Sequence, residues 1–455
     1  MFKTLKNALK VKEIREKLFF TFLMMIIIRI GSQLPIPGVD AEYLETFSAS
    51  LKSNGAYSFF GAFTGGSLEQ MSVFALSITP YITSSIIMQL LTIAIPKLEE
   101  LQKEGETGRK KIAEITRYVT VALALVEGVA MSIGFGNMGI CGDSAIMGKA
   151  GMAEYIFTIV KIVLTMTAGS AVLMWIGEKI TEKGVGNGIS IILVINIVSR
   201  IPKDLYVLYE TKVASATSIG MAVLAAAIIV LVIVLMIAFV VILQAAYRKI
   251  PVQYAKKVQG RQMVGGNSSH IPLKVNTAGV VPVIFASSLM QFPIIIAQVF
   301  GANPGDGTVF GTILKVLNSG SWFVIDKNNP MEFAYTGGFL IYALLVVAFA
   351  YFYTSITFNP MEVADNMKKS GGFVPGIRPG KPTEEYLTKI LNYIVFMGAV
   401  ALLIVAGVPI ILSGVFAASV SFLGTSLIIV VGVVIETIDK LSSMMVVRNY
   451  KGFLD

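Results

Sequence analysis

Long apolar runs, separated by short polar connections, occupy most of the chain. A helix of roughly 20 apolar residues crosses the hydrocarbon core of a bilayer, and most of the runs reach that length. The run at 217–245 contains no charged residue, whereas the run at 187–199 is short and follows a glycine-rich turn. We therefore predict an all-α polytopic membrane protein with ten transmembrane helices, at 18–35, 72–96, 118–137, 153–176, 187–199, 217–245, 277–300, 335–357, 391–413 and 420–438.

Basic residues are distributed unevenly over the connections between these runs. Of the 37 Lys and Arg residues, 28 fall on the two ends of the chain and the even-numbered connections, seven fall on the odd-numbered connections, and Arg29 and Lys161 lie within runs. Cytosolic connections are enriched in basic residues, so we expect both termini to be cytosolic. Residues 1–17 then form a basic amphipathic segment on the cytosolic surface, and 441–455 form a cytosolic tail.

Ten spans divide into two sets of five. Because five is odd, a second five-span copy would enter the membrane in the opposite direction, which is the inverted-repeat architecture of many membrane carriers. We expect an N-terminal half at 18–205 and a C-terminal half at 206–440, which carries cytosolic loops at 247–275 and 359–390.

The composition argues against most enzyme classes. Charged residues make up 14% of the chain, against about 25% in soluble domains. A single histidine, His270, and a single cysteine, Cys141, cannot build a zinc site, a haem ligand pair or an intrachain disulfide. The glycines at 184–188 precede an apolar run and lack the Gly-Lys-Ser/Thr signature of a nucleotide-binding loop. We therefore expect neither enzymatic activity nor a cofactor.

Charges inside the spans are few. Glu127 and Lys161 lie at similar depth in spans three and four, so an ion pair between them is one interpretation. No chain of acidic residues crosses the membrane, which weighs against the main alternative function, an ion-coupled secondary transporter of small solutes.

Branched side chains recur at helical spacing in spans two and five. Ile78 and Ile82 are four residues apart among hydroxyl residues, and Ile189 and Leu193 repeat this spacing after the glycines. Such residues can form an apolar collar that closes a water-filled path by dewetting. Ordinary packing between helices is the competing interpretation that the residues themselves leave open.

The two large cytosolic loops are strongly basic. No Asp or Glu occurs between Thr211 and Pro304, and cations there alternate with Tyr247, Tyr254 and Val258. The loop at 368–381 is rich in glycine and proline, which predicts a rigid, non-helical projection. Such surfaces suit ribosomal RNA or an acidic protein, and charge near lipid headgroups is the alternative.

Six sequence blocks, in this order along the chain, resemble the SecY/Sec61-alpha family, the channel subunits of the Sec protein translocon. The resemblance covers nearly the whole chain and is weakest in the outer loops at 138–152 and 301–334. The blocks are Ile28–Ser32 with Pro35–Gly38, Phe74–Leu76 with Pro80–Ile82, Glu104–Lys111, Gly177–Ser190, Pro272–Gly279, and Phe358–Pro360 with Gly376–Gly380.

The resemblance implies two inverted pseudo-symmetric five-helix halves around a central pore, with three sets of functional residues. A plug helix at about 58–71 would include Phe59, Phe60, Gly61, Phe63, Gly65 and Gly66. A pore ring would consist of Ile78, Ile82, Ile189, Leu193, Ile284 and Ile429. A lateral gate between spans two and seven would use Thr83, Ile86, Glu127, Asn276 and Phe292, which favours a gate role for Glu127 over a pair with Lys161.

The resemblance also implies a function and a set of partners. The chain would be a passive channel in a bacterial plasma membrane that passes unfolded, signal-bearing polypeptides and releases membrane helices sideways into lipid. Expected partners are SecE, SecG, the motor ATPase SecA and the ribosome with its RNA; SecA, the ribosome or the proton-motive force would supply energy. The docking surface would include Arg248, Lys249, Lys256, Lys257, Arg261, Lys368, Lys369, Arg378 and Lys381.

Overall fold

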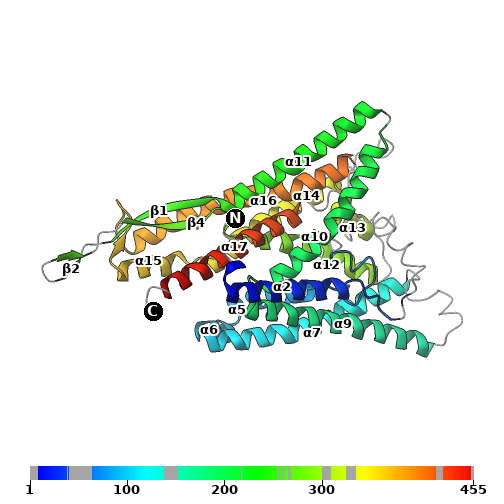
Figure 1. Cartoon of the computed structure of the whole chain (residues 1–455), viewed down its shortest axis with the longest axis horizontal. Coiled ribbons are helices and arrows are strands. Elements are labelled where there is room, and N and C mark those ends of the chain that lie inside the picture. Colours follow the sequence, from blue (N-terminus) through cyan, green and yellow to red (C-terminus); the bar gives the residue numbers. More distant parts are fainter. Residues whose placement is uncertain are drawn as a thin grey trace. The chain divides into compact units, whose positions relative to one another are not determined.

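Each of the ten predicted spans overlaps a helix (Figure 1), although span two, predicted from residue 72, is helical only from Thr79 because residues 72–78 run mainly through turns. The computed structural model describes residues 9–37, 39, 64–137, 152–216, 218–254, 257–259, 262–264, 268–299, 309–323, 335–416 and 424–451. The spans correspond in order to α2 (Lys12–Gly31), α5 (Thr79–Ala94), α7 (Glu106–Asn137), α9 (Met152–Lys183), α10 (Gly188–Tyr209), α11 (Ile219–Ala245), α12 (Val281–Val299), α14 (Gly337–Thr357), α16 (Lys381–Phe416) and α17 (Thr425–Lys451).

Within the described residues, five helices are long and apolar enough by themselves to cross a membrane. A sixth span is obtained if α5 is joined to α6 (Pro96–Lys103), which follows at an angle of 101°. The break has a local cause, because Ile95 is extended and Pro96 begins the new helix, where its missing N–H is tolerated. The ten-span architecture agrees with these helices, and several predicted runs begin or end inside longer helices.

The chain divides into two compact units. The first comprises Met1–Leu208, Gln291–Ser321 and Val433–Asp455, and the second comprises Tyr209–Met290 and Trp322–Gly432. Helices α12 and α17 each begin in the second unit and end in the first.

In the first unit, α7 and α9 pack with the segment before α5 around a core that includes Leu68, Met71, Ala124 and Met166, and α5 packs against α7. The glycine-rich turn between α9 and α10 has a structural explanation. A Cβ at Gly188 would overlap the carbonyl oxygen of Gly177, and the Gly188 N–H donates to Thr181 Oγ1 at 2.8 Å. Close approach of two helix ends, and not phosphate binding, therefore accounts for Gly188.

The second unit contains strands that the sequence analysis did not predict. Strand β1 (Tyr247–Tyr254) lies between β4 (Ser268–Lys274) and β5 (Gly372–Phe373), and both pairings are antiparallel. A separate hairpin joins β2 (Lys257–Gln259) to β3 (Gln262–Val264). The residues beneath the three-stranded sheet come from β1, β4, α15 (Pro360–Lys369), the segment after it, and α16: Ile250, Val252, Leu273, Ala364, Met367, Val374, Leu387 and Ile394.

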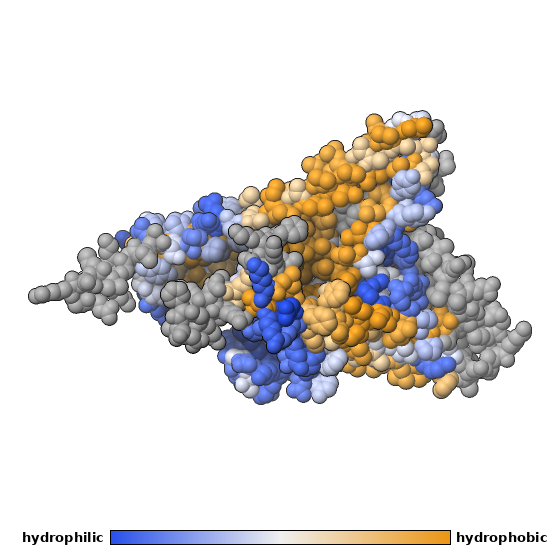
Figure 2. Space-filling view, viewed as in Figure 1, coloured by the Kyte–Doolittle hydropathy of each residue, from blue (hydrophilic) through white to orange (hydrophobic). Residues whose placement is uncertain are grey.

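The surface of α11 is almost entirely apolar. Only Met236, Val240 and Leu243 are buried along its length, and Figure 2 shows its hydrophobic side chains as a nearly continuous band. Exposed apolar surface of this extent is expected only against lipid or another protein, which agrees with a membrane-embedded helix.

Candidate functional site

The segment before α5 is held firmly in the first unit. Residues 64–78, here called the turn segment, run mainly through turns. Its backbone pairs with the residues that follow α2, since Ile36 N donates to Met71 O and Val73 N donates to Leu34 O, each at 2.9 Å. The predicted plug overlaps this segment from residue 64 onward. Gly65 and Gly66 lie in it with φ of 64° and 87°, whereas Phe59, Phe60, Gly61 and Phe63 lie outside the described residues.

Polar side chains of α10 bind the turn segment. Asn196 Nδ2 donates to Ser77 Oγ at 3.1 Å. Further along the helix, Arg200 and Lys203 form ion pairs with Glu69 at 2.9 and 2.7 Å. The residues 196, 200 and 203 share one helical face, because side chains three and four positions apart are neighbours. The sequence analysis counted Arg200 and Lys203 only among the basic residues of the odd-numbered connections and assigned them no role.

Four of the six predicted ring residues belong to the first unit. Ile78 is buried and precedes the first turn of α5, and Ile82 follows one turn later. On α10, Leu193 and Ile189 lie one and two turns before Asn196, whose side chain contacts the residue next to Ile78. This hydrogen bond therefore links the helix that carries Leu193 and Ile189 to the residue before Ile78, while the Ile189 side chain lies against Gly177 of α9. Ile284 and Ile429 lie on α12 and α17 in the second unit.

The predicted gate residues are also divided between the units. Thr83 and Ile86 lie on α5 and Glu127 on α7, whereas Asn276 precedes α12. The Asn276 side chain is 6% exposed, and its amide makes no hydrogen bond to the described residues. Phe292 falls within α12, but its side chain is outside the part that the structure describes.

The ion pair considered between Glu127 and Lys161 is wrong. Both residues are described, and no ion pair joins them. Lys161 Nζ lies instead over the ring of Phe157, 5.4 Å from its centroid. Similar depth in the membrane did not place the two side chains on facing sides of their helices.

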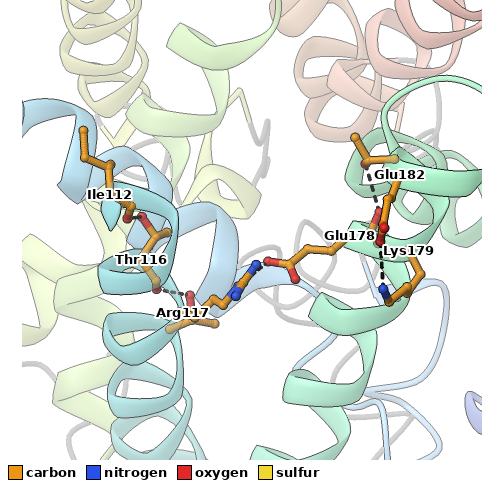
Figure 3. A network of polar contacts seen from close by, with 9 residues as sticks. Ile112, Thr116, Arg117, Glu178, Lys179 and Glu182 are labelled. Carbon is orange, nitrogen blue, oxygen red and sulfur yellow. Dashed lines mark hydrogen bonds and ion pairs between the residues drawn. The ribbon is translucent and has the colours of Figure 1, made fainter. Parts of the chain in front are cut away.

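An ion pair that the sequence analysis missed connects α7 to α9. Arg117 Nε lies 2.7 Å from Glu178 Oε1, and Figure 3 shows the two side chains bridging their helices. Lys179 pairs with Glu182 in the next turn of α9 at 2.7 Å. Arg117 and Glu178 are 61 residues apart in sequence, so no short-range pattern in the sequence predicts this ion pair.

The structure joins the two basic loops into one body. Pairing of β1 with β5, including Gln253 with Phe373, connects the loop at 247–275 to the loop at 359–390. Six of the nine predicted docking cations are described and exposed on this body: Arg248, Lys249, Lys368, Lys369, Arg378 and Lys381. Lys257 lies on β2 with its side chain undescribed, and Lys256 and Arg261 lie outside the described residues. In Figure 2 the surface over β1 and α15 is predominantly hydrophilic.

Comparisons with known proteins identify the relatives of this chain. The family model described as SecY matches residues 72–438. A relative from Halalkalibacterium halodurans, named protein translocase subunit SecY, is 42% identical over 458 residues and covers 100% of both chains.

Two solved structures share the fold. One concerns the plug domain of the SecY protein, described as stabilising the closed state of the translocation channel and maintaining a membrane seal; it has a TM-score of 0.59 at 18% identity. The other is Sec61 in the canine ribosome–channel complex from the endoplasmic reticulum, with a TM-score of 0.58 at 16% identity. Each match covers 94% of this chain and 92% of the chain in the solved structure.

Proposed function

The chain belongs to the SecY family of protein translocase channel subunits, and we propose that its seal is a ring of six branched side chains covered by the plug. Membership makes the chain a protein-conducting membrane channel. The small-solute transporter considered as the alternative gains no support from the relatives. The observation that supports the residue assignment is the hydrogen bond from Asn196 to Ser77, which links α10 to the residue directly before Ile78.

A ring of branched apolar side chains meets both requirements of the channel. It offers no hydrogen bonds to a passing chain, so polypeptides of any sequence can slide through it. It also seals around the chain by contact, and closes by dewetting when the pore is empty. In the resting state the plug, whose last predicted residues, 64–71, form the first part of the turn segment, covers the ring.

The lateral gate is proposed between spans two and seven. Thr83, Ile86 and Glu127 would face Asn276 and Phe292 across it. An amide buried without a hydrogen bond costs about 1–3 kcal/mol. The Asn276 amide makes no hydrogen bond to the residues that the structure describes, which supports a gate position where polar partners change. A signal segment opens the gate only if it binds the open state more tightly than the closed one.

The partners and the membrane follow from the family. We propose the bacterial plasma membrane, with both termini cytosolic, and SecE and SecG as the accompanying subunits. SecA or the ribosome would dock on the joined basic loops, whose cations suit acidic protein or ribosomal RNA. SecA, the ribosome or the proton-motive force would supply energy.

Reconstitution tests this function. Liposomes that contain the chain with SecE should take up a signal-bearing precursor when SecA and ATP are added, and the internalised precursor should resist external protease. Liposomes with SecE alone are the control. Equal protection with and without the chain would refute the proposal.

Crosslinking tests the gate. In a background with Cys141→Ser, the pair Thr83→Cys and Phe292→Cys should, after oxidation, lock the gate and stop export, because the two spans can no longer separate. Reduction should restore uptake, and either single cysteine should have no effect. Full export by the crosslinked channel would place the exit elsewhere.

A further inference from the structure

The turn segment carries a single acidic residue, and the structure buries it against two cations. Glu69 is 8% exposed, and its two carboxylate oxygens are divided between Arg200 and Lys203. Arg200 is 13% exposed and also pairs with Asp204 at 3.3 Å, whereas Lys203 is 54% exposed. These three residues, Glu69, Arg200 and Lys203, are here called the clasp.

Two further contacts hold the segment on either side of the clasp. Gly65 approaches α10 so closely that a Cβ there would lie 2.8 Å from the Asn196 Cα atom. At the other end, Ser77 accepts the hydrogen bond from Asn196. Gly65, Glu69 and Ser77 of the segment therefore contact α10, and the clasp is the part of this contact that depends on charge.

The clasp exists only while the turn segment lies on α10. A carboxylate in a poorly hydrated position requires its cations, and removing one partner of such a pair is strongly destabilising. When the segment leaves, Glu69 gains water, and Arg200 keeps Asp204 from its own helix. The ion pairs to Glu69 are thus made in one state and lost in the other, which is the condition for a contact to shift an equilibrium.

We propose that Glu69, Arg200 and Lys203 are positioning residues that hold the plug on span five and set how readily the empty channel opens. This inference rests on the proposed function, because it takes residues 64–71 of the turn segment, which include Glu69, to be the end of the plug. The charge-dependent contact explains why a buried acid and its cations occur at this point in a chain with few other charges in its spans.

The first test neutralises the acid. Glu69→Gln, in the channel complex reconstituted in a planar bilayer, should increase the open fraction of the resting channel about tenfold, which corresponds to ~1.4 kcal/mol. Uptake of a precursor with a defective signal sequence should rise in parallel. Glu99→Gln is the matched control, because it removes an exposed 2.6 Å ion pair with Lys103 on α6 and should change neither quantity.

A charge swap separates positioning from a general structural role. Glu69→Arg combined with Arg200→Glu should return the open fraction toward that of the unchanged channel, whereas each single reversal should exceed Glu69→Gln. Lys203→Gln, at a half-exposed position, should leave folding intact and give a smaller increase. If the two single reversals and the double variant all show the same open fraction, pairing between these side chains is refuted.

The outcomes also distinguish the clasp from the channel itself. The Glu69→Gln and Lys203→Gln channels could stay closed while channels with glycine substitutions in the ring leak ions. The role proposed for the clasp would then be wrong, and the assignment of the chain as a channel would stand. If the ring substitutions are also silent and no precursor is taken up, the proposed function is wrong.

Steric displacement provides an uncharged test of the same contact. Gly65→Ala places a methyl group against the Asn196 backbone at a residue with φ of 64°, a left-handed conformation that residues with a Cβ rarely adopt. The open fraction should rise, and the charge swap should not reverse it. An unchanged open fraction would show that the segment does not need to lie on α10 to close the channel.

Discussion

Replacing Ile78, Ile82 and Ile429 with glycine or asparagine should raise the ion conductance of the resting channel. The expected cause is loss of the dewetted constriction, because an apolar waist excludes water and ions only while bulky side chains narrow it. Ile78 is a sensitive position, since it is buried and begins α5 directly after the residue that Asn196 contacts.

Single-channel recording in planar bilayers measures this effect. Leucine at the same three positions should preserve the seal, because its volume and polarity are similar. Ile228→Asn is the matched control for the polar exchange, since Ile228 is exposed on α11. Removing a buried isoleucine side chain costs about 2–5 kcal/mol of stability, so each variant must first be shown to assemble with SecE. Resting conductance that does not change in assembled variants would remove the ring assignment.

The spans were predictable because their signal is local. A run of apolar residues identifies a membrane helix wherever the run lies, as α11 illustrates, and the glycines at 184–188 marked the beginning of α10 correctly. The ends of the helices were less predictable. Polar residues at 106–117 extend α7 well before the apolar run begins, since a helix need not end where the lipid does.

The three-stranded sheet was missed for a different reason. Its two longer strands lie in a loop interpreted only through its charge, although Ile250 and Val252 are buried while their neighbours are exposed. This alternation is too short to stand out beside cations and tyrosines. The third strand, at Gly372, comes from a loop more than one hundred residues later in the chain. No periodic pattern of residues in the sequence predicts which distant segment will pair with a strand.

Contacts between distant residues explain what remained unpredicted in the candidate site. Glu69 and Lys203 are 134 residues apart, and the pairing of Arg117 with Glu178 has no sequence signal either. Similar depth in the membrane was not enough to predict an ion pair between Glu127 and Lys161. Depth gives the height of a residue in the bilayer and does not give the side of the helix from which its side chain projects. The ring and gate positions came from the family resemblance, and helical spacing could supply only the pairs within one span.

Arg378→Glu should abolish SecA-driven export while leaving the channel folded. Arg378 is exposed, and its backbone is fixed by neighbours: Thr383 Oγ1 donates to the Arg378 carbonyl at 2.8 Å, and Ile377 N donates to Val374 O at 3.0 Å. Val374 in turn is buried beneath the sheet. A surface substitution of this kind changes stability by only about 0.5 kcal/mol.

The functional effect should be far larger than the effect on stability. Like charges placed opposite each other at an interface cost several kcal/mol, and about 3 kcal/mol corresponds to more than a hundredfold loss of affinity. ATP-dependent precursor uptake and the affinity of SecA for channel-containing liposomes measure it. Lys97→Glu reverses an exposed cation at the start of α6, outside the two joined basic loops, and should export normally. Normal export by Arg378→Glu would exclude this residue from coupling to the motor, and a reduced affinity in both variants would show that net charge alone, and not the position held by the sheet, recruits the motor.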